Sequence, residues 1–439
     1  MKRTTFLILL LASLTASAQT AGSLTLSLQQ AMDTGLKNRY DVQANGYAIA
    51  LAENAVRKKK NEWLPDIKGS GDIRYNAQVQ STYIPPGLLG LSKSELLTLG
   101  AKNATVFGLD LEQPVYAPGI TMDVKIAQNE LALQKETNRQ AATDIKMQIA
   151  GAYLDVLLKD LQQQLVSHDE RRYREYFELA QGKYDHGSLT GNDYLQIRLD
   201  YENAKVQTAK ASQNYALAVD NLKHQVNIPA GTTLLLSDTP GSENISQYQP
   251  PAAYTVSDRT ELRQLRLREQ SQRLQLQKTR QGVLPTLSFV GNYSQQFLYD
   301  NFNYTKGEWW SPFSYIGLKL TVPLTAHISN RADRREYQFE LAQTAWTIRQ
   351  KTADIDYEVQ KTATELDNAW KNMQITKKNY ELSDTIYQNQ QQQFALGAFQ
   401  YSSLLDAGRT VSTAEQNYIS AVYDYLLATL TYQRATGGF

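Results

Sequence analysis

The chain has no cysteine, and no long run of apolar residues follows its first few positions. Its 439 residues include 4 histidines, and lysine plus arginine (45) nearly equal aspartate plus glutamate (44). The lack of cysteine excludes a disulfide framework and a lipid-anchored lipoprotein form. The charge balance argues against a nucleic-acid-binding surface. Because no later stretch has the length of a transmembrane helix, a mature chain that enters a membrane has to do so as a β-barrel.

Catalytic and cofactor-binding motifs are also missing from the sequence. The four histidines are scattered, and none lies in an H-E-x-x-H or cysteine-rich context that would indicate a metal site. There is no G-x-S-x-G nucleophile elbow, no phosphate-binding P-loop and no dinucleotide-binding glycine pattern. We therefore expect no enzymatic activity, no cofactor and no metal.

The N-terminus has the pattern of a secretory signal peptide. Basic residues precede an apolar run from Phe6 to Leu14, and Ala16-Ser17-Ala18 supplies a small-residue cleavage site. We expect residues 1–18 to be removed and the mature chain to start at Gln19. The apolar run is too short for a membrane anchor.

The rest of the chain consists of two halves that repeat each other. Three pairs of matched positions lie about 210 to 220 residues apart: Leu64-Pro65 with Leu284-Pro285, Pro114 with Pro323, and Gly187 with Gly397. The sequence predicts one duplicated unit, with a first repeat over 19–228, a Pro/Gly/Ser/Asn-rich connector over 229–258 and a second repeat over 259–439. Each repeat comprises a helix, two strands and a long helical hairpin.

Each repeat contains two segments in which apolar and polar residues alternate. These strand patterns cover 67–79 and 105–115 in the first repeat, and 287–294 and 316–322 in the second. Strands of about ten residues have the length that a tilted strand needs to cross a bilayer. A loop is expected over 83–103, and the loop before 316 carries Trp and Tyr, which suit a membrane–water interface. The alternation alone equally fits a soluble sheet with one wet face.

The helical segments are long and carry a seven-residue period. A first helix over 27–63 stops before Pro65. Longer helices are predicted over 119–187, 192–227, 329–396 and 401–434, the first spanning about 100 Å. Their apolar seams, such as Leu366, Trp370 and Met373 in the third, are typical of helices packed lengthwise. Because the seams of the second and fourth are rich in Ala and Tyr, we expect each helix to need neighbours beyond one partner.

Four strands per chain cannot close a barrel. Open sheet edges in lipid would leave backbone groups unpaired, so closure requires several chains in a symmetric oligomer. A trimer would supply twelve strands, with their polar face lining a wet pore that the helices extend through the periplasm. The spacing alone does not fix the number three.

On these features the chain resembles the TolC-like outer-membrane efflux protein family, over nearly all of its mature length. The resemblance is carried by the Leu-Pro junctions, the strand-ending prolines, the turn glycines and Thr260-Glu261-Leu262-Arg263. It implies an α+β membrane protein, a homotrimer whose twelve-stranded outer-membrane β-barrel continues into a long periplasmic α-helical barrel. It also implies the exit duct of a tripartite efflux pump, which passively conducts substrates from a periplasmic adaptor protein and an inner-membrane pump to the exterior.

The resemblance assigns the helix turns to periplasmic tips that meet the adaptor. The candidate contacts are three residues in each turn: Gly187, Ser188 and Leu189, and Gly397, Ala398 and Phe399. The glycines would supply a backbone conformation that side chains resist, although any helical hairpin has that need. Leu189 and Phe399 are expected to be exposed apolar residues, which favours an interface.

Two carboxylates, Asp193 and Asp406, follow the turns. By resemblance they would face the lumen at a periplasmic constriction, where copies related by symmetry would favour cations and repel anions. Alternatively, each is a solvated residue that interacts with the dipole at a helix start. The sequence departs from the family pattern at Phe399, where an arginine can occur, and at Phe394, where a tyrosine occurs. We therefore expect an apolar rather than an ionic latch.

Two alternatives stay open. A duct for type I protein secretion would have the same shape, because specificity lies mainly in the pump. A periplasmic coiled-coil adaptor or tether would also contain paired helices, but adaptors usually combine one hairpin with lipoyl-like and barrel domains. The expected location is the outer membrane, in contact with its lipid and with a large periplasmic part.

Overall fold

The structure, a computed structural model, describes residues 23–87, 90, 92–98, 100–238, 259–395 and 401–438. The expected signal peptide and most of the connector lie outside the described residues. The chain forms two compact units, each built from segments of both halves. We call them the helical unit (Met1–Ala44, Gln140–Arg259 and Asp354–Phe439) and the sheet unit (Asn45–Arg139 and Thr260–Ala353). The division of the sequence into two repeats remains a prediction.

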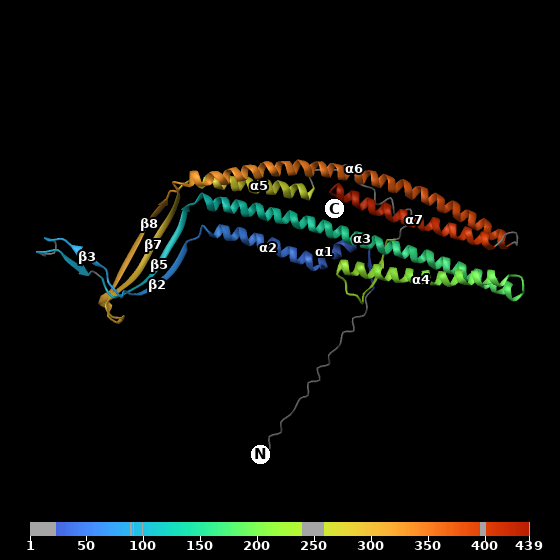
Figure 1. Cartoon of the computed structure of the whole chain (residues 1–439), viewed down its shortest axis with the longest axis horizontal. Coiled ribbons are helices and arrows are strands. Elements are labelled where there is room, and N and C mark those ends of the chain that lie inside the picture. The colour runs from blue at the N-terminus through green and yellow to red at the C-terminus, as the bar shows by residue number, and fades with distance from the viewer. Residues whose placement is uncertain are drawn as a thin grey trace, which may run out of the picture. The chain divides into compact units, whose positions relative to one another are not determined.

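The sheet unit contains a four-stranded antiparallel sheet (Figure 1). In spatial order its strands are β2 (Asp66–Tyr75), β5 (Asn103–Tyr116), β7 (Thr286–Tyr299) and β8 (Trp310–Thr321). All four segments predicted from alternation form strands, although the first was predicted to reach residue 79 and β2 ends at Tyr75. The two halves of the sequence meet where β5 pairs with β7. Among the described strands, β2 and β8 each have a neighbour on one side only.

The stretch predicted as a loop over 83–103 contains further strands. Here β3 (Ser81–Ile84) pairs antiparallel with β4 (Glu95–Thr98). Between β7 and β8, a short 3-10 helix, η3 (Gly307–Trp309), leads back into the sheet. The aromatic residues of this connection pack on the sheet, because the ring of Tyr304 lies 4.9 Å from that of Phe297 and its hydroxyl lies 3.0 Å from Thr105 Oγ1.

The helix predicted over 27–63 is two helices. Arg39 is extended (φ −66°, ψ 134°) and separates α1 (Leu28–Asn38) from α2 (Tyr40–Asn61). In the sheet unit, α5 (Thr260–Gln281) lies beside the first part of α3 (Pro118–Asp185). An ion pair of 2.6 Å between Lys278 and Asp123 joins these two helices.

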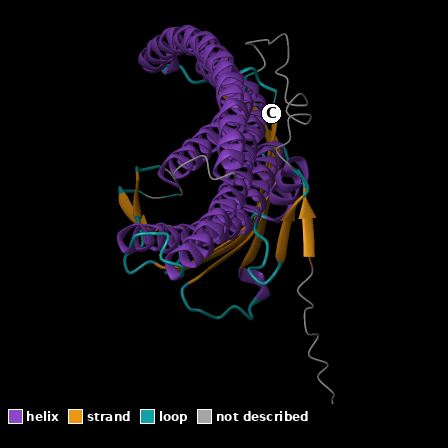
Figure 2. Ribbon diagram, turned by 90° about the vertical axis from the view of Figure 1, so that its right-hand side faces the viewer, coloured by secondary structure: helices purple, strands orange, loops and turns teal. Residues whose placement is uncertain are grey.

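The helical unit contains two long hairpins, whose helices are purple in Figure 2. One is formed by α3 and α4 (Gly191–Val226), and the other by α6 (Ala326–Ala395) and α7 (Tyr401–Ala435). These bounds follow the predicted ones closely. Part of the predicted connector is a strand, because β6 (Thr233–Leu236) pairs in parallel with β1 (Ser23–Leu26). Among the described residues, no helix has both the length and the apolar character that crossing a membrane would demand.

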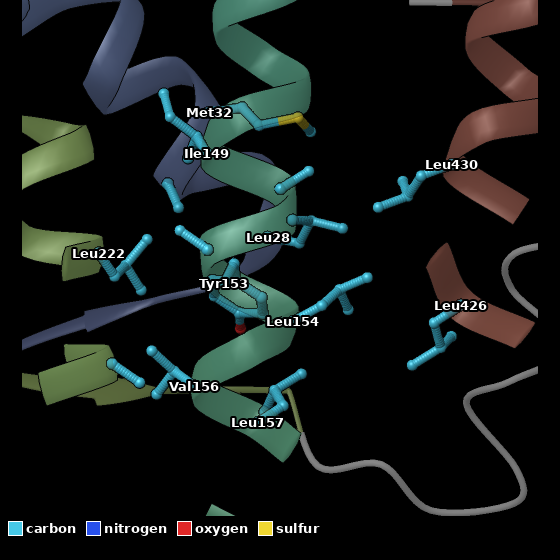
Figure 3. Packing of buried hydrophobic residues seen from close by; sticks show 14 of the residues in the cluster. Leu28, Met32, Ile149, Tyr153, Leu154, Val156, Leu157, Leu222, Leu426 and Leu430 are labelled. Atoms are coloured by element: carbon cyan, nitrogen blue, oxygen red, sulfur yellow. The ribbon is translucent and has the colours of Figure 1, made fainter. Parts of the chain in front are cut away.

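The core of the helical unit gathers side chains from five helices. Figure 3 shows Tyr153 and Leu154 of α3 with Leu222 of α4 on one side and Leu426 and Leu430 of α7 on the other. Further buried residues come from α1 and α6 and from the strands β1 (Leu26) and β6 (Leu234). Each helix therefore has more than one neighbour, as its small-residue seam predicted.

One seam position was predicted wrongly. Trp370 of α6 is 42% exposed, whereas Ala369 packs against the core between Leu366 and Met373. The seam therefore steps by three and then four residues here. The Trp370 ring lies at the rim, 5.1 Å from the ring of Tyr425.

Tyr153 provides a test of this core. Its buried hydroxyl lies 3.1 Å from the Leu26 carbonyl oxygen and 2.8 Å from Asp238 Oδ2, both possible acceptors. Tyr153→Phe should destabilise the unit by about 0.5–1.5 kcal/mol, because it removes a buried hydrogen-bond donor, whereas the two acceptors keep the backbone N–H groups of Ser237 and Leu28. The matched control is Tyr47→Phe, at an exposed position of α2. A thermal unfolding midpoint lowered equally by both substitutions would contradict this role.

Candidate functional site

The four-stranded sheet has one apolar and one polar face. One row on each face illustrates the register: Ile67, Leu111, Gly291 and Ile316 on the apolar face, and Lys68, Asp110, Asn292 and Tyr315 on the polar face. On the polar face, Asn292 Nδ2 donates to Asp110 Oδ1 at 2.8 Å. On the apolar face, Ile316 is 81% exposed in the single chain. Soluble monomers rarely leave an apolar surface of this kind in water, so this face suits an apolar environment.

At the turn between α3 and α4, α3 is followed by a glycine in the left-handed backbone conformation. Gly187 has a φ of +69°, and its N–H donates to the Tyr184 carbonyl at 2.9 Å. The Ser188 N–H donates to the Lys183 carbonyl at 2.8 Å. Together these bonds form a Schellman motif, which satisfies the last carbonyl groups of α3. The predicted backbone role of Gly187 is confirmed.

The two candidate constriction residues are exposed near the starts of α4 and α7. Thr190 Oγ1 accepts the Asp193 N–H at 3.2 Å and donates to Asp193 Oδ2 at 2.6 Å. Asp193 therefore takes part in the N-terminal cap of α4, which is the local alternative considered for it. Asp406 lies on α7, where its charge acts on Arg409 three residues later. Their role at a constriction remains a prediction.

The candidate tip residues are only partly described. Gly187 and Ser188 are exposed, but Leu189 is half-buried rather than exposed as expected. Its side chain packs against a group of buried residues that we call the tip cluster: Tyr176, Ala180, Ile197, Tyr387, Leu404, Ala407 and Val411. Gly397, Ala398 and Phe399 lie outside the described residues.

The tip cluster joins the two hairpins of the helical unit. The hydroxyls of Tyr176 on α3 and Tyr387 on α6 lie 2.6 Å apart, and these residues are 211 positions apart in the sequence. That separation matches the offset of the repeat. Phe394 at the end of α6 also packs on the cluster, and the Lys183 ammonium lies 5.0 Å from its ring centre. Apolar packing at Phe394 agrees with the expectation from its sequence.

Ionic contacts between the hairpins accompany this packing. Asp200 of α4, whose side chain is only 10% exposed, pairs with Arg409 of α7 at 3.4 Å. A hydrogen bond that Arg409 donates to the Tyr173 side chain raises the pKa of Arg409, despite the opposing effect of burial. The contact was not predicted, although Asp200 and Arg409 are separated by 209 positions, which again is close to the repeat offset. The packing near the turns is thus not apolar alone.

A second set of interacting polar side chains lies farther from the turns along the hairpins. Arg172 of α3 pairs with Asp169 and donates to Ser412 Oγ of α7 at 2.6 Å. Ser412 in turn donates to Asp169 Oδ1 at 2.8 Å. Burial raises the pKa of Asp169, and the charge of Arg172 partly offsets that shift. No sequence motif indicated this group, because Ser412 is not at the repeat offset from either partner.

Glu415 of α7 is half-buried beside this group. Burial raises the pKa of its carboxyl, and the nearby charge of Asp169 raises it further, whereas Arg172 lowers it. Across the described ranges, no cluster of three or more His, Cys, Asp or Glu side chains is placed to hold a metal ion.

Comparison with known proteins decides the family. The model of the outer membrane efflux protein family matches residues 31–227 and 255–438. The chain belongs to the outer membrane efflux protein family. Its members are outer membrane channels, so this chain is an outer membrane efflux channel protein with a periplasmic part.

Individual relatives are distant in sequence. The alkaline protease secretion protein AprF of Pseudomonas aeruginosa is 22% identical over 339 residues, which are 73% of this chain and 67% of AprF. A crystal structure of CusC matches with a TM-score of 0.75 at 16% identity, covering 97% of this chain and 96% of CusC. The Neisseria gonorrhoeae MtrE outer membrane channel matches with a TM-score of 0.72 at 14% identity, covering 93% of this chain and 88% of MtrE. These likenesses establish the fold.

Glu415 gives a prediction with a defined pH dependence. Because its folded-state pKa is raised above the ordinary value of 4.5, the folded protein holds this proton more tightly than the unfolded chain does. This tighter proton binding stabilises the folded protein below pH 4.5. The stabilisation is lost as the pH rises through the folded-state pKa of Glu415. Glu415→Gln should therefore have a higher unfolding midpoint than the wild type at pH 7, and this advantage should disappear at pH 4.

The control for this measurement is Glu365→Gln, which removes an exposed carboxylate on α6. It should show no comparable change with pH. If the unfolding midpoints of Glu415→Gln and the wild type differ by the same amount at both pH values, the pKa of the Glu415 carboxyl is not shifted.

Proposed function

We propose that the chain is the exit duct of a tripartite efflux pump and acts as a homotrimer. The observation that carries this proposal is the sheet, which combines an apolar face with two edge strands that each lack a partner on one side among the described strands. In lipid such edges are unfavourable, because each unpaired backbone group costs several kcal/mol.

The strand directions suit closure by further copies of the chain. The order β2-β5-β7-β8 is antiparallel throughout, so β8 runs opposite to β2. Edge strand β8 of one copy can therefore pair antiparallel with β2 of the next copy. Three copies would give twelve strands, an even number within the range of closed outer-membrane barrels. The polar face would line the pore, and the apolar face would meet the lipid.

The duct would be passive and would depend on partners. The sequence contains no nucleotide-binding motif, so energy would come from an inner-membrane pump. A periplasmic adaptor protein would meet the helix turns, with Gly187, Ser188 and Leu189 as candidate contacts in the first turn. The equivalent contacts in the second turn would be Gly397, Ala398 and Phe399. No catalytic step is assigned to this chain.

A second candidate function is a duct for protein secretion. The observation that favours it is the similarity to AprF, which is named as an alkaline protease secretion protein. Both functions use the same duct, and transport assays with a co-expressed pump would separate them by the cargo that leaves the cell.

A pair of adjacent substitutions tests the membrane assignment of the sheet. Ile316→Lys places a charge on the apolar face, whereas Tyr315→Lys places it on the polar face of the same strand. A lysine facing lipid costs about 2–4 kcal/mol near the membrane centre. We expect Ile316→Lys to reduce the amount of trimer recovered from the outer membrane several-fold, and Tyr315→Lys to leave it near the wild-type level. Equal recovery of the two variants would argue against a lipid-facing apolar surface.

The proposed constriction has its own test. Replacing Asp193 and Asp406 together with Asn should lower the cation selectivity of the channel, because it removes the negative charges that symmetry repeats. Selectivity is read from the reversal potential in a salt gradient. Glu365→Gln combined with Asp367→Asn is the matched control, since it removes two exposed carboxylates of α6. An unchanged reversal potential in the Asp193/Asp406 variant would remove both residues from this role.

A further inference from the structure

The helical unit contains a cleft between α3, α6 and α7. Its volume is about 200 Å³. One part of its wall is aliphatic, formed by Leu165, Ile419 and Val422. An engineered apolar cavity of about 150 Å³ holds a benzene molecule, so this cleft has room for one ring-sized group.

A pair of tyrosine rings forms another part of the wall. The rings of Tyr380 on α6 and Tyr418 on α7 are nearly parallel, with an interplanar angle of 6° and centroids 6.2 Å apart. Both side chains are half-buried. The face of an aromatic ring attracts a cation within about 6 Å of its centre, and the attraction grows when the site is shielded from water.

The third element of the cleft is the carboxylate of Glu415. In the described part of the chain it has no hydrogen-bond or ion-pair partner. The neighbouring cation, Arg172, is already engaged by Asp169 and Ser412 and lies over the ring of Tyr387 at 5.1 Å. Glu415 therefore leaves a negative charge at the cleft that the protein does not neutralise by a direct contact.

We propose that this cleft binds a small organic cation, an ammonium group that carries one apolar substituent. The Glu415 carboxylate would neutralise the ammonium charge, and the Tyr380 and Tyr418 rings would contact it through their π faces. The apolar substituent would lie against Leu165, Ile419 and Val422. Each part of the wall thus has a matching part in the ligand.

Other ligand classes fit the cleft less well. A hard metal ion needs several oxygen ligands, whereas a single carboxylate lines this cleft. An anion would meet the charge of Glu415, with Asp169 and Asp384 adding to the negative potential. His168 also lines the wall, and it is exposed. The site does not depend on the proposed duct activity, because binding can be measured without transport.

The test uses purified full-length protein in a non-ionic detergent, with benzyltrimethylammonium as the probe. Benzyl alcohol is the neutral comparison, because it keeps the ring without the charge. Titration calorimetry or ligand-observed NMR should detect saturable binding of the cation and much weaker binding of the alcohol. We expect Glu415→Gln to weaken cation binding at least about tenfold, and the exposed-site control Glu365→Gln to leave it unchanged.

A second variant separates the charge from the aromatic contact. Tyr418→Leu keeps the carboxylate and an apolar side chain but removes one ring, so we expect a loss of about two- to fivefold in cation affinity. Circular dichroism and oligomer mass report whether each variant is folded. The proposal is overturned if the wild type does not bind the cation, if the alcohol binds as tightly, or if neither Glu415→Gln nor Tyr418→Leu weakens binding.

Discussion

The two outer edges of the four-stranded sheet, which have no partner among the described strands, are the constraint that calls for an oligomer. Strands β2 and β8 expose backbone donors and acceptors, while the face that carries Ile67 and Ile316 is apolar and exposed. Water would satisfy the edges but not the face, and lipid would satisfy the face but not the edges. Pairing of β8 with β2 of another copy resolves both requirements together, which is why we propose an oligomer.

The hairpins of the helical unit are subject to a related constraint. The seams of α4 and α7 contain several alanines, which bury little apolar area between one pair of helices, and the core draws side chains from five helices. Near the turns, equivalent positions of the two repeats meet, as Tyr176 meets Tyr387 and Asp200 meets Arg409. These contacts join the hairpins within one chain. A duplicated sequence thus produces a nearly symmetric pair of hairpins.

Most of the fold could be predicted from local sequence patterns, whereas pairings between segments that are distant in the sequence could not. Alternation over 105–115 and 316–322 was sufficient to predict β5 and β8, and the placement of prolines and glycines at the ends of the helical segments predicted the helix bounds. The pairing of β1 with β6 was missed, because the two strands are about 210 residues apart and each has four residues. The Glu415 cleft was missed for the same reason, since its walls come from three helices that no short motif connects. Gly187 was predictable because a left-handed turn residue leaves a local signature, whereas the half-burial of Leu189 depends on a distant cluster.

Single-channel conductance in planar bilayers, with the oligomer mass determined on the same purified sample, tests the central claim most directly. We expect a detergent-extracted trimer with a small, cation-selective conductance. A monomeric protein that stays in solution without detergent and gives no conductance would contradict the proposed duct and favour a periplasmic adaptor or tether.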